Sequence, residues 1–201
     1  KNKMVWHDDI EIPKSDLLIL PGGFSYGDYL RCGSIASKSK IMKSVLNFAK
    51  GGGKVIGICN GFQILVEAGL LPGVLLRNKY LEFICKNVFV KVNNKDNSYF
   101  KDIKKDILEF HIAHNEGNYF CSKEQIKEID DNNQIALFYS DESGNVNEAN
   151  NPNGSIKNIA GIFNKEKNVL GMMPHPERMI DPALSGEDGS IFFENLINNL
   201  K

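Results

Sequence analysis

Cys59 has the clearest chemical context in the sequence. It stands in segment 57–63 (GICNGFQ), between an apolar run typical of a buried strand and a helical pattern. Sites of α/β proteins form at such strand ends. Gly57 and Gly61 permit the tight turn of a nucleophile elbow, and the free N–H groups at a helix start favour a thiolate. The competing interpretation is a packed core cysteine, and the segment by itself does not decide between the two.

A base for such a thiol is offered by segment 174–177 (PHPE). A thiol nucleophile needs a proton acceptor, which in turn needs an orienting carboxylate. His175 and Glu177 are residues of these two types. Pro176 disfavours a helical conformation of His175, so the two side chains project in related directions. A loop histidine in solvent is the competing interpretation, but a cysteine at an elbow favours the role of base.

A second histidine has the same relation to a carboxylate. His114 and Glu116 repeat the H-x-E spacing at the end of a strand-like run, Ile107 to Ile112. Spacing alone does not separate this pair from His175 and Glu177. The prolines that flank His175 favour it as the base, and His114 stays open as the alternative.

A glycine pair at positions 22 and 23 ends another apolar run, in segment 20–28 (LPGGFSYGD). Glycine lets the backbone approach a ligand closely with its N–H turned outward. Together with the N–H of Asn60, such a group could stabilise the oxyanion of an acyl transfer. Most glycine pairs only make turns, so this motif carries weight only beside Cys59.

The cysteines and histidines do not indicate a metal site. The four cysteines form no C-x-x-C pair, and the H-x-x-H pair of His111 and His114 has no third ligand at a recognisable spacing. We therefore expect no metal in this chain. Without a disulfide framework, a reducing compartment is favoured.

The composition excludes several classes of protein. Lysine plus arginine (24) nearly cancels aspartate plus glutamate (25), and 42% of the residues are apolar. These values indicate a globular chain without a basic surface for nucleic acid. No apolar run is long enough to span a membrane, and no charged-then-apolar leader opens the sequence. We expect a cytoplasmic protein that binds neither nucleic acid nor membrane.

Strand and helix patterns alternate along the sequence, with a polar loop at 142–158 and no linker that divides the chain. The alternation predicts a single domain over residues 1–201, an α/β fold with a mostly parallel sheet and helices on both faces. The predicted helices span Lys38–Lys50, Asn60–Leu70, Ser122–Asp131 and Ser190–Leu200. The predicted strands span Met4–Trp6, Leu17–Leu20, Lys54–Ile58, Phe83–Val92, Ile107–Ile112, Ile159–Phe163 and Val169–Met172.

Together these segments resemble class I glutamine amidotransferases, which use a Cys-His-Glu triad on a flavodoxin-like fold. Segments 57–63 and 174–177 carry the general pattern. A narrower pattern is similar to the glutaminase subunits that serve a synthetase of purine biosynthesis, and the match runs from about residue 4 to about residue 197. The narrower pattern is carried by segments 20–32 (LPGGFSYGDYLRC), 70–78 (LLPGVLLRN), 113–119 (AHNEGNY) and 171–178 (GMMPHPER).

The resemblance implies a role for each matching residue. Cys59 would attack the side-chain amide of glutamine, form a γ-glutamyl thioester and release ammonia, while His175 relays protons and Glu177 orients it. Segment 113–117, which contains the rival base, would lie beside the substrate and outside the triad. The backbone N–H groups of Gly23 and Asn60 would hold the oxyanion, and Gln63 would help bind the glutamine.

The resemblance also implies partners. Ammonia would pass to a large synthetase subunit that uses ATP and magnesium to convert formylglycinamide ribonucleotide to its amidine, and a small subunit would bridge the two. The chain itself would need no cofactor. Two other functions stay open: a non-catalytic assembly subunit, and a stand-alone cysteine hydrolase of γ-glutamyl compounds.

The start of the sequence departs from the family pattern. Family members usually have a further strand and helix before the segment that matches residues 4–6, and here the sequence begins at that segment. The missing strand normally lies inside the sheet, so its absence would expose an apolar strand edge. We expect a fragment, an incomplete gene model or a diverged start.

Overall fold

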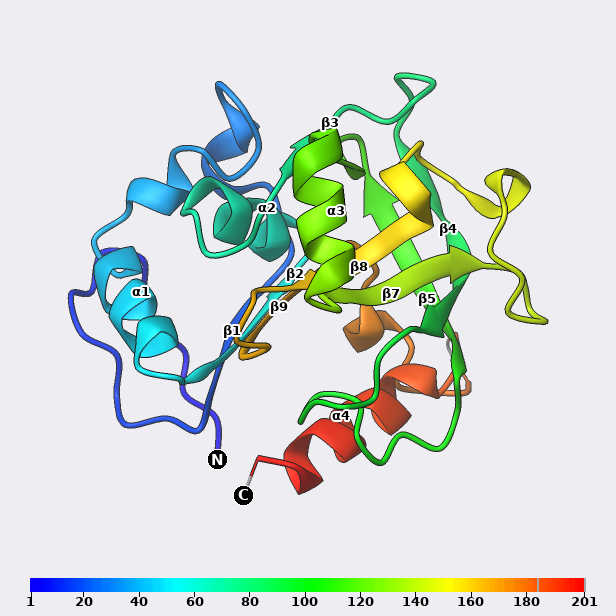
Figure 1. Cartoon of the computed structure of the whole chain (residues 1–201). Coiled ribbons are helices and arrows are strands. Elements are labelled where there is room, and N and C mark those ends of the chain that lie inside the picture. The colour runs from blue at the N-terminus through cyan, green and yellow to red at the C-terminus, as the bar shows by residue number, and fades with distance from the viewer. Residues whose placement is uncertain (184, 201) are drawn as a thin grey trace.

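The computed structural model describes residues 1–183 and 185–200. Its main feature is a seven-stranded sheet in the order β1-β2-β9-β8-β7-β4-β5, with a small sheet of β3 and β6 beside it (Figure 1). The strands are β1 (Leu17–Leu20), β2 (Lys54–Ile58), β3 (Val74–Leu76), β4 (Ile84–Val92), β5 (Ile107–His114), β6 (Asn118–Phe120), β7 (Ile135–Ser140), β8 (Ile159–Phe163) and β9 (Val169–Met172). The α-helices are α1 (Met42–Lys50), α2 (Asn60–Glu67), α3 (Lys123–Asp131) and α4 (Asp188–Asn198). None of the helices in the described residues has the length and apolar character of a membrane span.

The sheet is mixed, which corrects the expectation of a mostly parallel one. β1 runs parallel to β2, and β2 to β9. The pairs from β9 through β8, β7 and β4 to β5 are all antiparallel. The connection from β8 to β9 spans only residues 164–168, which is too short for the helical crossover of a parallel pair. The α/β class is confirmed, but alternation of strands and helices did not determine the strand directions.

Helices cover both faces of the sheet, as predicted. α2 packs against the face to which Gly57 of β2 and Gly171 of β9 belong. α4 packs against the opposite face, where the ring centroids of Phe192 and Phe110 are 6.2 Å apart. An aromatic core fills the space between α4 and the sheet; its fully buried members are Tyr99, Phe100, Phe110, Phe163 and Phe192.

Most predicted elements form, with shifted ends. Ser122 caps α3 as expected: its hydroxyl accepts from the Gln125 N–H (3.2 Å), while the Gln125 side chain accepts from the Ser122 N–H (3.1 Å). Residues 36–38 form a separate 3-10 turn before α1. The predicted strand Met4–Trp6 is not a strand in the structure. The sequence patterns missed β3, β6 and β7.

We expect Gly171→Ala to destabilise the fold. The new methyl group would lie 2.1 Å from a ring carbon of the buried Phe62 and 2.5 Å from Leu71. Overpacking of this kind costs about 1–3 kcal/mol, which should lower the urea midpoint of unfolding. Gly51→Ala is the matched control, since Gly51 has φ −77° and its added Cβ would come no closer than 3.3 Å to another atom. Equal stability of the two variants would contradict this packing.

Candidate active site

Cys59 occupies a sharp turn between β2 and α2. It has φ 50° and ψ −106° and stands at the N-cap of α2, a conformation that non-glycine residues rarely adopt. Its N–H donates to the Met172 carbonyl (2.8 Å), which fixes the turn to β9. A Cβ on Gly61 would lie 2.0 Å from the Leu20 carbonyl oxygen. The turn therefore requires a glycine two residues after the cysteine, as an elbow does.

The edge of β5 brings Cys59 and His175 together. The carbonyl groups of His111 and Ala113 are two residues apart, so they point to the same edge of the strand. The His175 N–H donates to the His111 carbonyl (2.7 Å), and the Cys59 thiol donates to the Ala113 carbonyl (3.8 Å). The thiol of Cys59 and the backbone of His175, which are 116 residues apart in the sequence, are thus bonded to neighbouring carbonyl groups along one strand edge.

Gly22 lies between these two side chains. A Cβ built on Gly22 would be 2.6 Å from Cε1 of His175 and 3.5 Å from the Cβ of Cys59. The imidazole of His175 and the Cβ of Cys59 therefore border the same small space, and only a hydrogen atom fits there. The resemblance implies a role for Gly23 of the glycine pair, whereas the steric role of Gly22 was not predicted. A Cβ on Gly23, which has φ 145°, would meet nothing within 4 Å.

Glu177 orients the imidazole of His175. Its Oε1 lies 2.5 Å from Nδ1 of His175, and it belongs to a 3-10 turn that begins at Pro176. Since a carboxylate accepts, Nδ1 donates, and Nε2 of the neutral ring carries the free lone pair. His175 is 2% exposed, and its Nε2 has no hydrogen-bond partner among the described residues. The ring thus presents an unused proton acceptor at Nε2.

The rival base His114 has different partners. Its Nδ1 contacts Oδ1 of Asn78 (3.1 Å), an amide and not a carboxylate. Burial, with a smaller contribution from His175, lowers the pKa of His114 to about 4. Glu116, its predicted carboxylate, lies 3.8 Å from Arg77. His114 is therefore a buried neutral imidazole without an acidic partner.

Two buried carboxamides connect the segments around Cys59. Asn60 donates to Oε1 of Gln63 (2.8 Å) and accepts from the Ser25 N–H (3.1 Å). Gln63 donates to the Glu116 carbonyl (2.6 Å). Both side chains make contacts within the protein; the resemblance implies a substrate-binding role for Gln63, and for Asn60 only through its backbone N–H. They hold the 20–28 loop and the 113–117 segment against the start of α2.

The thiol of Cys59 is protonated at neutral pH. Burial raises the pKa of Cys59 to about 12, and Glu177 and Asp28 also raise it. The Asn60 N–H and the Arg178 guanidinium lower the pKa, but by less than burial raises it. The N–H group at the helix start therefore favours the thiolate, as expected, but burial has the larger effect on the pKa of Cys59. Reaction of this thiol requires a neighbouring base.

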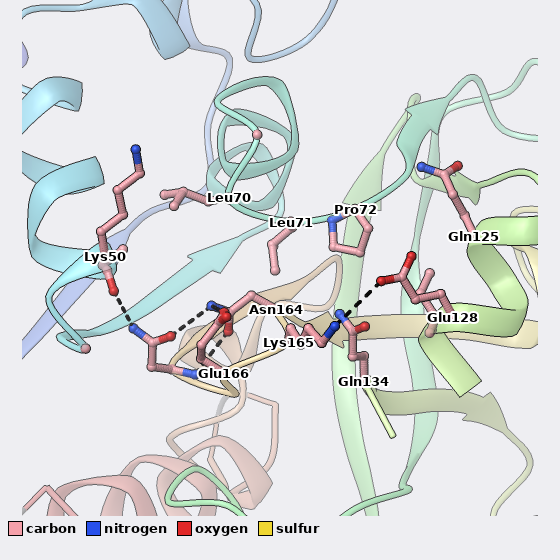
Figure 2. A pocket seen from close by; sticks show the side chains of 15 residues that line it. Lys50, Leu70, Leu71, Pro72, Gln125, Glu128, Gln134, Asn164, Lys165 and Glu166 are labelled. Atoms are coloured by element: carbon pink, nitrogen blue, oxygen red, sulfur yellow. Dashed lines mark hydrogen bonds and ion pairs between the residues drawn. The ribbon is translucent and has the colours of Figure 1, made fainter. Parts of the chain in front are cut away.

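One hollow of the described structure lies away from these residues. Figure 2 shows this hollow, about 550 Å³, bordered by the ends of α1 and α2, by α3 and by the 164–168 turn. It borders the beginnings of β2 and β9, whereas Cys59 follows the end of β2. The figure also shows Lys165 facing Glu128, 4.0 Å apart. Among the described residues, no three His, Cys, Asp or Glu side chains are arranged to hold a metal ion.

Comparisons with known proteins define the class. The family model of the CobB/CobQ-like glutamine amidotransferase domain matches residues 2–186. With the elbow cysteine and the paired histidine and glutamate, this makes the chain a glutamine amidotransferase.

Individual relatives with high sequence identity narrow this class to one family. Phosphoribosylformylglycinamidine synthase subunit PurQ of Pelagibacter ubique (strain HTCC1062) is 88% identical over all of this chain and 88% of its own length. The subunit PurQ of Gloeobacter violaceus is 47% identical over 97% of this chain and 84% of its own. A chain in the structure of PurLQS from Thermotoga maritima has a TM-score of 0.83 and 39% identity, covering 96% of this chain and 84% of that one.

The chain belongs to the PurQ family, the glutaminase subunits of phosphoribosylformylglycinamidine synthase. This confirms the resemblance and the class I fold that were inferred from the motifs. The absence of a first strand and helix stays a prediction. In the structure, β1 lies at the edge of the sheet, and Ile19 is partly exposed there.

We expect Gly22→Ala to slow the reaction of Cys59 with iodoacetamide. The added methyl group would displace the His175 ring, whose Cε1 lies 2.6 Å from its position, and remove the base from the thiol. Loss of general-base assistance should reduce the rate at neutral pH at least about tenfold, measured by mass spectrometry of the Cys59 peptide. Gly51→Ala, at the end of α1, serves as control. The same rate in both variants would refute this arrangement.

We expect His114 to make stability dependent on pH. Because its folded-state pKa of about 4 lies below its ordinary value near 6.5, the unfolded chain takes up the proton first. Stability therefore falls as pH drops from 6.5 to 4, by about 3 kcal/mol. His114→Asn keeps a donor for Asn78 but does not titrate, so its free energy of unfolding should fall less steeply. Parallel pH profiles of the two chains from urea titrations would exclude His114 as the cause.

Proposed function

We propose that this chain hydrolyses glutamine with a Cys59–His175–Glu177 triad and supplies the ammonia to a synthetase subunit. The observation that carries the proposal is the adjacent attachment of Cys59 and His175 along β5, with Glu177 on the far nitrogen of the imidazole. A thiol nucleophile, an imidazole that can accept its proton and an orienting carboxylate are the parts that nucleophilic acyl transfer needs.

In the first half of the reaction, Nε2 of His175 takes the thiol proton as Sγ of Cys59 attacks the amide carbon of glutamine. Glu177 stabilises the imidazolium that forms. The imidazolium then gives its proton to the departing nitrogen, and ammonia leaves a γ-glutamyl thioester. In the second half His175 takes a proton from water as the water attacks the thioester carbon. The carbon–sulfur bond then breaks, Sγ of Cys59 takes the proton back from His175, and glutamate is released. One base would serve both steps.

The oxyanion of each tetrahedral intermediate would be held by the backbone N–H groups of Gly23 and Asn60. The Asn60 N–H lowers the pKa of the Cys59 thiol, which supports a position facing the reacting atoms. Donors fixed in the backbone need no reorganisation during the reaction. Gln63 would contribute to binding the glutamine, in addition to its contact with the Glu116 carbonyl.

The assembly would contain further subunits. The similarity to a chain of the PurLQS structure supports a large synthetase subunit and a small bridging subunit as partners. ATP and magnesium would act on the synthetase, which converts formylglycinamide ribonucleotide to its amidine, and this chain would hold no cofactor. We further propose that residues 1–201 act as one amidotransferase domain in the cytoplasm.

We expect Cys59→Ser to abolish the glutamine-dependent formation of the amidine by the assembled enzyme. The rate should fall about a thousandfold or more. The serine hydroxyl is a much weaker nucleophile, and the ammonia-dependent reaction of the synthetase should be unchanged. Cys121→Ser, at a buried cysteine outside the triad, is the control. Full glutamine-dependent activity of Cys59→Ser would refute the assignment, and loss of both reactions would indicate failed assembly.

A further inference from the structure

A second cysteine and histidine lie together on the outer face of the β4–β5 pair. In this antiparallel register Cys85 is opposite Ala113, and Asn87 is opposite His111. Side chains of such directly opposed positions and their diagonal neighbours share one face of the sheet. Cys85 and His111 are therefore diagonal neighbours on a face that the triad does not use.

The side chains on this face form a connected series. Sγ of Cys85 lies 3.4 Å from Nε2 of His111, and Nδ1 of His111 lies 2.9 Å from Oδ1 of Asn87. Asn87 in turn donates from Nδ2 to Oε1 of Glu109 (3.0 Å). Because the carboxylate only accepts, it sets the orientation of the amide, whose oxygen then faces the imidazole.

This orientation determines the proton positions on His111. The amide oxygen of Asn87 can only accept, so Nδ1 of His111 donates to it, and Nε2 is left to accept from the Cys85 thiol. Burial lowers the pKa of His111, with Arg178 and His175 acting in the same direction and Glu177 opposing them. The ring is therefore neutral near pH 7 and able to take a proton.

Cys85 is open to small molecules. It is the exposed one of the four cysteines, whereas Cys32, Cys59 and Cys121 are buried. Together with Asn87 it borders a hollow of about 760 Å³ between β4 and the 140–152 segment. A thiol with a hydrogen-bonded base, an orienting amide and free access is a nucleophile prepared for reaction.

We propose that Cys85, His111 and Asn87 form a thiol-modification site, separate from the catalytic cysteine, that forms mixed disulfides with small disulfide molecules. The Cys85 proton moves to Nε2 of His111 as the sulfur attacks one atom of the incoming disulfide bond. That bond breaks, a new one forms to Cys85, and the departing thiolate takes the proton from His111. One disulfide replaces another, so no further oxidant is needed.

The test uses the full chain with Cys59→Ser, which removes the other nucleophile, and the neutral probe 2,2′-dithiodipyridine. We expect one rapid reaction at neutral pH, located at Cys85 by peptide mass mapping. Adding His111→Gln, which keeps the backbone contact to His175 but removes the base, should slow it about tenfold. Lys91→Ala, further along β4, is the matched control and should react at the original rate.

Two results would overturn the proposal: labelling of Cys32 or Cys121 before Cys85, or equal rates with and without His111→Gln. To exclude misfolding as the reason for a slow rate, the urea midpoint of each variant is measured alongside. A His111→Gln chain that is slow and has the midpoint of the Lys91→Ala control supports the site. Asn87→Ala provides a second measurement, because it removes the acceptor for Nδ1 together with the link to Glu109 and should also slow the reaction.

Discussion

The candidate active site depends on hydrogen bonds to the outer edge of β5. β5 is the last strand of the sheet, so its carbonyl groups on that edge have no neighbouring strand. The carbonyls of His111 and Ala113 are bonded instead by the His175 N–H and the Cys59 thiol. A backbone edge is more rigid than a set of side chains. It can therefore hold two segments from distant parts of the chain at neighbouring positions.

Close approach at this edge explains the glycines around it. Any side chain at Gly22 would meet the His175 ring, and any at Gly61 would meet the Leu20 carbonyl. The same strand also carries His111 on its other face, toward Cys85. The backbone carbonyl of His111 thus bonds to His175, while its side chain belongs to a second thiol–imidazole pair with Cys85 of β4.

Local patterns predicted the elements well where a turn or cap had its own chemical signal. The capping pair Ser122 and Gln125 marked the start of α3, and glycines marked the elbow at Cys59. Strand direction was not predicted, because it depends on which strands become neighbours and not on the order of strands and helices. β7 was missed although its residues are almost all buried. A short apolar run does not distinguish a strand from other buried segments.

The sequence by itself determined the chemical types and the family: an elbow cysteine, a histidine with a carboxylate two residues later, and motifs that the PurQ relatives share. Only the tertiary structure decided which atoms meet. The spacing of His114 and Glu116 equals that of His175 and Glu177, yet only the second pair is in contact. Sequence spacing describes neighbours along one segment. The attachment of Cys59 and His175 to the same strand edge depends instead on how β2, β5 and the segment after β9 pack, which no local pattern contains.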